Sequence, residues 1–180
     1  MVGMSKKRLA TVWLDGCSGC HMSFLDIDER LLTLSGLADV VYSPLVDAKV
    51  YPEDVDLALV EGAVSSEDDL HKIQMVRQRT KTLVSLGDCA VTANVPGMRN
   101  PFGLKPIYDR AYRENVTFDP GIPNQIVPPL LPYSRPIHEI VTVDVFVPGC
   151  PPSADTIYYV VTELLEGRQP DLKTRTRFGA

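Results

Sequence analysis

The sequence Leu-Ala-Thr-Val-Trp-Leu-Asp-Gly-Cys-Ser-Gly-Cys at residues 9–20 decides the fold class. Its first half, residues 9–14, is a short apolar run typical of a buried strand. After a turn at Asp15 and Gly16, apolar side chains recur at helical spacing as far as Gly36, which is expected to end one continuous helix. This apolar stripe consists of Phe24, Ile27, Leu31 and Leu34. A strand that leads directly into a helix indicates a protein of alternating strands and helices.

The same alternation continues along the chain. Further strands are expected at residues 38–42, 55–60, 82–86 and 141–147. The last of them is almost continuously apolar around Asp144, as expected for a strand buried on both faces of a parallel sheet. Parallel neighbours require crossover connections, so helices would cover both faces. We therefore predict a single α/β domain over residues 1–180, a flavodoxin-like doubly wound parallel sheet of about five strands.

Two helices have recognisable ends. Ser65 or Ser66 can cap a helix that is acidic at its start and basic at its end, an order that suits the helix dipole. The charged residues are Glu67, Asp68 and Asp69 at the start and Arg77, Arg79 and Lys81 at the end. We interpret them as helix-end charges and not as a ligand site. A later helix begins after Pro-Pro-Ser at residues 151–153 and is stopped by Gly167.

Residues 96–136 form a proline-rich insertion before the last strand. Nine of the 15 prolines lie there, and proline removes backbone donors that a helix or central strand would use. A short helix over residues 107–113 is expected inside the insertion. Its aromatic and aliphatic side chains argue against disorder, and loops of this length are usually functional. We interpret it as an interface loop laid against a partner chain, with a lid packed on its own domain as the alternative.

Composition and charge exclude several classes of protein. The formal net charge is −5, and no basic stripe supplies the attraction that nucleic acids require. No apolar stretch reaches the roughly 20 residues that span a bilayer, and the start does not resemble an export signal. We therefore expect a cytoplasmic protein, in a reducing compartment where cysteine patterns indicate metal binding or redox chemistry. The basic tail, residues 173–180, is expected to be a solvated end.

The four cysteines of the chain all follow expected strand ends. Cys17 and Cys20 follow the first strand, Cys89 the fourth and Cys150 the fifth. Ligands of open parallel sheets collect outside the carboxyl ends of the strands, so the four thiols are expected to converge on one edge. Glycines at residues 16, 19, 87 and 149 would let the backbone approach a bulky group. A 4Fe-4S cluster takes four cysteine ligands, and the chain has four cysteines in all, so the count favours one such cluster.

Three other interpretations of the cysteines stay open. Zinc more commonly uses two close pairs, or one pair with histidines, whereas here one close pair joins two distant single cysteines. A thioredoxin-like dithiol at Cys17 and Cys20 would leave the other two unexplained. Four inert core cysteines would be unusual in turns such as Gly149-Cys150-Pro151.

Four short blocks carry the distinctive residues of the chain. They are LDGCSGC at residues 14–20, LVEGAV at 59–64, GDCA at 87–90 and PGCPP at 148–152. Together, and in this order, they resemble the small subunit of nickel-iron hydrogenases. The resemblance implies that Cys17, Cys20, Cys89 and Cys150 bind the proximal 4Fe-4S cluster. It further implies that electrons arrive singly from a nickel-iron centre in a separate large subunit, where hydrogen is split.

Two differences from the family pattern indicate which group of hydrogenases the chain resembles most. The chain lacks the second, two-cluster domain of many members and the twin-arginine signal of exported ones. It is therefore similar to the small subunits of cytoplasmic, NAD-reducing (bidirectional) hydrogenases, which implies diaphorase partners with FMN, NAD and further iron-sulfur clusters. An NADP-linked or deazaflavin-reducing relative is the alternative within that group.

Two other functions are runners-up. One is the cluster-bearing 20 kDa subunit of respiratory complex I, whose site begins with adjacent cysteines, unlike the spaced Cys17 and Cys20. The other is a flavodoxin-like FMN-binding redox module, although residues 15–20 lack a hydroxyl-rich phosphate loop.

A few polar residues are secondary candidates. By the family motif Glu61 would lie near the subunit interface, as a candidate proton relay or simply as a capping carboxylate. His21 could hydrogen-bond the cluster or the partner, whereas His71 and His138 are expected on the surface. Trp13 and Asp15 are expected to pack and orient the first turn.

Overall fold

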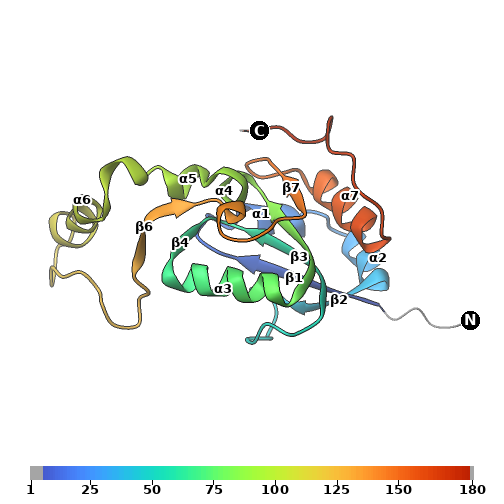
Figure 1. Ribbon diagram of the computed structural model, residues 1–180, viewed down its shortest axis with the longest axis horizontal. Helices are drawn as coiled ribbons and strands as arrows, with labels where there is room; N and C mark the ends of the chain where they lie inside the picture. The colour runs from blue at the N-terminus through green and yellow to red at the C-terminus, as the bar shows by residue number, and fades with distance from the viewer. Residues whose placement is uncertain (1–5, 179–180) are drawn as a thin grey trace, which may run out of the picture.

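The computed structural model describes residues 6–178, and its centre is a five-stranded parallel sheet (Figure 1). The strands are β1 (Lys7–Trp13), β2 (Ala38–Tyr42), β3 (Val55–Glu61), β5 (Thr80–Leu86) and β7 (Val145–Val147). Their order across the sheet is β2-β1-β3-β5-β7, which confirms the flavodoxin-like prediction. Residues 1–5 and 179–180, at the outer ends of the predicted domain, lie outside the described residues.

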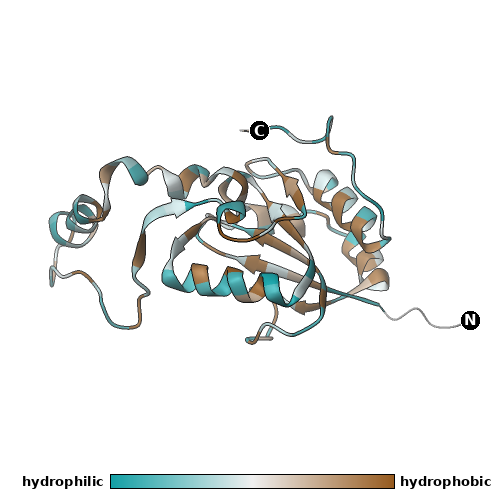
Figure 2. Cartoon of the chain, viewed as in Figure 1, coloured by the Kyte–Doolittle hydropathy of each residue, from teal (hydrophilic) through white to brown (hydrophobic). Residues whose placement is uncertain are grey.

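Helices pack on both faces of this sheet (Figure 1). One face carries α1 (Gly19–Leu25), α2 (Arg30–Leu37) and α7 (Ala154–Leu165), and the other carries α3 (Glu67–Gln78) and α4 (Asp88–Thr92). Alternate residues of β3 enter the two cores: Leu57 and Leu59 on one face, Ala58 and Val60 on the other. The apolar strands therefore lie between two helical layers, as the colouring of Figure 2 also shows. None of the helices in the described part of the chain is long and apolar enough to span a membrane.

The first helix is interrupted, contrary to the prediction. After α1 the backbone tightens, with two hydrogen bonds of the i to i+3 type: Ile27 N donates to Phe24 O, and Asp28 N donates to Leu25 O. Asp28 then adopts a left-handed conformation, with φ of 56°, before α2 begins. Gly36 lies inside α2 and does not end it, because the extended conformation of Ala38 does. Spacing alone detected the shared apolar stripe but not the turn within it.

The other two helix starts are as predicted. Ser66 caps α3, accepting a hydrogen bond from Asp69 N at 3.1 Å while the Asp69 carboxylate accepts from Ser66 N. Ser153 caps α7 in the same way, accepting from Thr156 N at 3.3 Å. Lys81 is the exception to the helix-end interpretation, because it belongs to β5 and pairs with Asp56.

The last strand is shorter and more exposed than predicted. Asp144 N donates to Leu83 O at 3.0 Å and the Asp144 carboxylate accepts from Leu83 N at 2.7 Å, but the strand itself covers only Val145–Val147 and not residues 141–144. β7 is an edge strand, and its Phe146 is 40 % exposed where it meets the ring of His138. The expected burial on both faces is therefore wrong for this strand.

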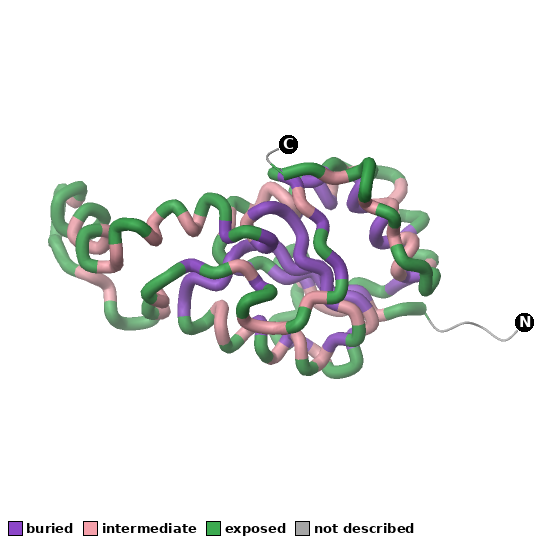
Figure 3. The backbone as a smooth tube through the Cα atoms, turned by 45° about the horizontal axis from the view of Figure 1, so that its top comes forward, coloured by how far each residue is buried: buried purple, intermediate pink, exposed green. Residues whose placement is uncertain are grey.

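Residues 96–136, called the arm below, extend away from the sheet (Figures 1 and 3). In place of one long loop they contain the end of α5 (Asn94–Gly97), η1 (Asn100–Phe102), α6 (Leu104–Asp109), the π-turn η2 (Arg110–Glu114) and β6 (Leu130–Arg135). The helix predicted at residues 107–113 falls within α6 and η2. β6 pairs antiparallel with β4 (Val64–Ser66), and Asn100 exchanges two hydrogen bonds with the backbone of Ser134. The base of the arm is thereby fixed to the domain.

Candidate iron-sulfur site

The structure brings all four cysteines to the carboxyl edge of the sheet. Cys17 and Cys20 lie at the start of α1 just beyond β1, Cys89 in the first turn of α4 beyond β5, and Cys150 beyond β7. All four are free thiols: Cys17 and Cys150 are exposed, and Cys20 and Cys89 are partly buried. A group held by these sulfurs would therefore lie between the sheet edge and the surface.

The four sulfurs act on one another electrostatically. Burial raises the pKa of the Cys20 thiol far above its usual range, and the charges of Glu61, Cys89 and Cys17 raise it further. Burial also raises the pKa of Cys89, where Cys150 and Cys17 add to the effect and a backbone hydrogen bond from Val95 opposes it. Burial and the neighbouring negative charges therefore favour the protonated form of the Cys20 and Cys89 thiols until a cation compensates them.

Two glycines make room for this group of sulfurs. Gly87 has φ of +83°, and a Cβ built on it would overlap Sγ of Cys20. Gly16 lies so close to Gly62 that its Cβ would meet the Gly62 Cα at 3.2 Å. Because these glycines have no side chains, the Cys20 thiol can lie against Gly87, and the first turn can pack closely against Gly62.

Hydrogen bonds tie together the three segments that carry cysteines. The buried Asp88 carboxylate accepts from Gly149 N at 2.6 Å, and Asp88 N donates to Gly149 O at 2.9 Å. Ser23 Oγ of α1 donates to Pro152 O at 2.6 Å. Asn94 Nδ2 lies 3.7 Å from the Cys150 sulfur, as a long hydrogen bond. The sequence analysis missed all three residues, although Asp88 stood beside a cysteine in the Gly-Asp-Cys block.

Glu61 ends β3 in a buried polar network beside the cysteines. Its carboxylate accepts from His21 N at 3.0 Å, and Oε1 lies 2.9 Å from His21 Nδ1 without hydrogen-bonding alignment. His21 Nε2 lies 2.9 Å from Thr11 Oγ1, which donates to Ser43 Oγ at 2.8 Å. The His21 ring thus faces the protein interior and not a partner. His71 and His138 are exposed, as predicted.

The first turn is oriented as expected. Trp13 Nε1 donates to Gly16 O at 3.3 Å, and Asp15 exchanges two backbone hydrogen bonds with Ala63. Both residues therefore orient the turn as predicted, but the predicted packing is wrong, because the Trp13 side chain is 45 % exposed and Asp15 is exposed as well.

The donor set fits an iron-sulfur cluster. Soft thiolates are the ligands that such clusters prefer. The four cysteines lie at the same edge of the sheet, with the Glu61 carboxylate beside the Cys20 thiol. Between residues 6 and 178, no three His, Cys, Asp or Glu side chains are grouped as ligands of a single metal ion. A cluster spreads its irons over several positions and gives each its own thiolate. The missing side chain of Gly87 leaves room for the Cys20 sulfur itself.

The raised thiol pKa values predict the pH dependence of the iron-free protein. In the unfolded chain the cysteines titrate near pH 8.5, whereas Cys20 in the folded chain keeps its proton well beyond that. The folded state therefore binds more protons as pH rises above about 8.5, and stability must fall. We expect the melting temperature of the iron-free protein to decrease between about pH 8 and pH 10, with a shallower slope in Cys20→Ala. Tyr51, whose pKa is raised to about 12, contributes only above that window.

Comparison with known proteins shows which families and proteins this chain is similar to. Residues 17–164 match the family described as NADH ubiquinone oxidoreductase, 20 Kd subunit. The chain is 41 % identical over 172 residues to the NAD-reducing hydrogenase HoxS subunit delta of Cupriavidus necator, covering 93 % of this chain and 82 % of that protein. It is 36 % identical to one subunit of the F420-non-reducing hydrogenase vhu of Methanocaldococcus jannaschii, but spans only 59 % of its length.

Solved structures agree with the sequence relatives. A chain of an NAD+-reducing NiFe hydrogenase in the H2-reduced state superposes with a TM-score of 0.91 at 40 % identity, covering 96 % of this chain and 99 % of that one. A NiFeSe hydrogenase from Dm. baculatum, at 18 % identity and a TM-score of 0.57, shares the fold. The chain belongs to the NADH ubiquinone oxidoreductase 20 kDa subunit family and, within it, to the small subunits of hydrogenases.

Proposed function

We propose that this chain is the electron-transfer small subunit of a nickel-iron hydrogenase and that Cys17, Cys20, Cys89 and Cys150 hold one 4Fe-4S cluster. The observation that carries the proposal is the meeting of four cysteines from three strand ends at one sheet edge. When bound, the cluster supplies one-electron transfer between the nickel-iron site of the large subunit and a diaphorase module. The chain itself orients the thiols through the ties at Asp88 and Ser23 and partly buries two of them.

The electron acceptor is proposed from the relatives. The first comparison protein is named as NAD-reducing, which supports a cytoplasmic complex whose diaphorase subunits carry FMN, NAD and further iron-sulfur clusters. The relatives named F420-non-reducing hydrogenases show that similar chains occur in other hydrogenases. Hydrogen-dependent reduction of NAD+ by the purified complex, against NADP+ and deazaflavin, decides between these acceptors.

One experiment tests the metal assignment directly. Iron and acid-labile sulfide are measured on the purified small and large subunits, together with electron paramagnetic resonance after reduction. Four irons and four sulfides per small subunit, with a cluster signal, are expected. Bound zinc, a bare dithiol or a flavin spectrum from the small subunit would each overturn the proposal in favour of a different function.

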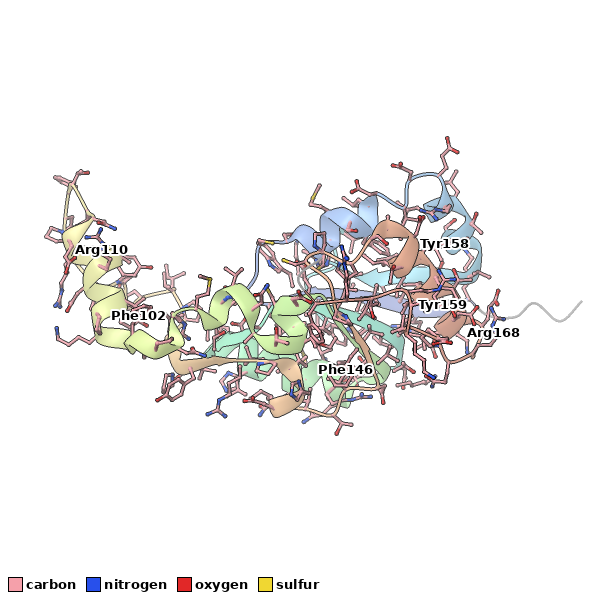
Figure 4. The ribbon with its side chains drawn as sticks, turned by 90° about the horizontal axis from the view of Figure 1, so that it is seen from above. Phe102, Arg110, Phe146, Tyr158, Tyr159 and Arg168 are labelled. Atoms are coloured by element: carbon pink, nitrogen blue, oxygen red, sulfur yellow. The ribbon has the colours of Figure 1, made fainter. Side chains whose placement is uncertain are left out.

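The face around the cysteines is suited to a large partner. Trp13, Met22, Val95 and Met98 expose apolar side chains near the carboxyl edge of the sheet. The arm adds Phe102, which Figure 4 shows well away from the α7 tyrosines, and Phe118, which is 86 % exposed. Exposed apolar patches of this kind mark interaction sites. We propose that the hydrogenase large subunit covers this face, with the arm as its interface element.

Hydrogen exchange tests the interface role of the arm. We expect amides of residues 96–136 to exchange at least about tenfold more slowly once the large subunit binds, because covered backbone opens less often. The outer face of α3 serves as the control and should not change. If amides of the arm exchange at the same rate in the free and the bound small subunit, the interface interpretation is wrong and the arm is a lid on its own domain.

Glu61 is proposed as a proton relay. It is 2 % exposed, contacts the Cys20 thiol and is held by His21 N, so a proton could pass along it without bulk water. Glu61→Gln should slow hydrogen-deuterium exchange at the active site about a hundredfold while iron content stays constant. Glu29→Gln, at an exposed carboxylate, is the control. Unchanged exchange in Glu61→Gln would leave Glu61 with a structural role only.

A further inference from the structure

The described part of the basic tail, residues 173–178, runs back over α7 and contacts it (Figure 1). The Arg175 guanidinium lies 3.9 Å from the centre of the Tyr159 ring, and Thr156 Oγ1 donates to Arg175 O at 3.2 Å. Tyr159, labelled on α7 in Figure 4, also accepts a hydrogen bond from Asp171 N at 3.1 Å. The tail was predicted to be a solvated end. Its charges are exposed, but its backbone is a defined part of the surface.

The tail forms one wall of a groove whose other wall is the turn that carries Cys150. The groove has a volume of about 400 Å³. Its lining consists of Pro148, Gly149, Pro151, Pro152 and Ser153 on one side and residues 174–177 on the other. Cys150 is exposed and lies on the same turn, next to the lining residues Gly149 and Pro151, but does not itself line the groove. Anything seated in this groove therefore lies beside the Cys150 turn.

The charge of the groove differs from that of the whole chain. Lys173, Arg175 and Arg177 are exposed, and none forms an ion pair within the described part of the chain. Arg168, by contrast, pairs with both Glu163 and Glu166. The chain carries a formal charge of −5, so a local group of uncompensated cations is unusual for it. The pKa of the Glu163 carboxylate is lowered by its hydrogen bond from Arg168 and also by the charge of Arg175, which acts on it without a direct ion pair. A group of exposed cations attracts an acidic partner and favours its orientation.

We infer that this groove is the docking surface of the subunit that accepts the electrons, and that this subunit presents acidic side chains to Arg175 and Arg177. The inference rests on the proposed function. The apolar face and the arm are assigned to the large subunit, so the acceptor needs a second surface near the same cysteines, and the groove provides it beside Cys150. The cluster that Cys17, Cys20, Cys89 and Cys150 would hold would supply one electron to the acceptor's own iron-sulfur or flavin centre. No bond or proton moves.

Charge reversal in the complete complex tests the inference. Arg175→Glu with Arg177→Glu should raise the dissociation constant between the hydrogenase pair and the diaphorase module at least about tenfold. Lys49→Glu with Lys72→Glu is the matched control, because it makes the same charge change elsewhere on the chain. The affinity of the parent complex should also fall between about 0.05 M and 0.5 M salt, and this dependence should be weaker in the Arg175 and Arg177 variant.

The outcomes separate this inference from the proposed function. Unchanged affinity and salt dependence, with iron and hydrogen-driven dye reduction intact, would overturn the docking surface alone. Loss of iron would instead point to the site itself. Calorimetric titration with inorganic phosphate is the third measurement. If the parent protein binds phosphate, the double variant does not, and both have the same affinity for the diaphorase module, the groove is a small-anion site and the inference is overturned.

Discussion

The Cys150→Ser variant is expected to lose hydrogen-dependent NAD reduction almost completely, to about a hundredth of the parent activity or less. A serine hydroxyl is a hard, poorly ionised ligand where an iron-sulfur cluster requires a soft thiolate. Cys150 lies on an exposed turn with no other cysteine in it, so no neighbouring thiol can substitute. Cys89→Ser should have the same effect for the same reason.

The measurements for these variants separate cluster loss from unfolding. Iron content and the paramagnetic signal should change, while NADH oxidation by the diaphorase with an artificial acceptor should continue in the assembled complex. The melting temperature reports whether the domain is still folded. Full iron together with full hydrogen-linked activity in both variants would reject these cysteines as ligands.

Gly87→Ala is expected to disrupt the site with nearly as large an effect, although no ligand is removed. Gly87 occupies a region of backbone conformation that is almost restricted to glycine, with φ of 83° and ψ of 161°, and a side chain there costs about 1–3 kcal/mol. The added methyl group would also overlap the Cys20 sulfur. Cys20 must then move away from the other three cysteines, and iron content should fall to less than about half.

Gly36→Ala is the matched control for this change. Gly36 lies inside α2, where an added Cβ meets nothing within 4 Å. Alanine should raise the free energy of unfolding by about 0.5–1 kcal/mol without affecting the cluster. Iron analysis, paramagnetic resonance and thermal unfolding on both variants make the comparison. A Gly87→Ala protein with the parent's iron content and signal would contradict the assigned role of this glycine.

The placement of the cysteines was predictable from sequence because it depends on a general property of parallel sheets. A strand can be detected from a local apolar run, and all parallel strands end at the same edge. Once β1, β5 and β7 were expected, Cys17, Cys89 and Cys150 had to lie near one another. The caps at Ser66 and Ser153 were predictable for a similar reason, since capping depends on residues only three positions apart.

Features that depend on distant contacts were not predictable in this way. The pairing of β4 with β6 joins Val64 to Arg135, and no local pattern indicates which segments will meet. The two hydrogen bonds between Asp144 and Leu83, one of them through the Asp144 carboxylate, also join segments 61 residues apart. The tie between Asp88 and Gly149 likewise links two loops that only the finished sheet brings together.

The arm has a consequence for how the protein must be made. Most of its length is exposed in Figure 3, and the apolar side chains of Phe118 and Ile126 are among the exposed ones. When the small subunit is synthesised alone, these exposed apolar side chains are expected to promote self-association and precipitation. Recombinant production is therefore expected to yield more soluble protein when the large subunit is expressed together with this chain, because the large subunit would cover these side chains.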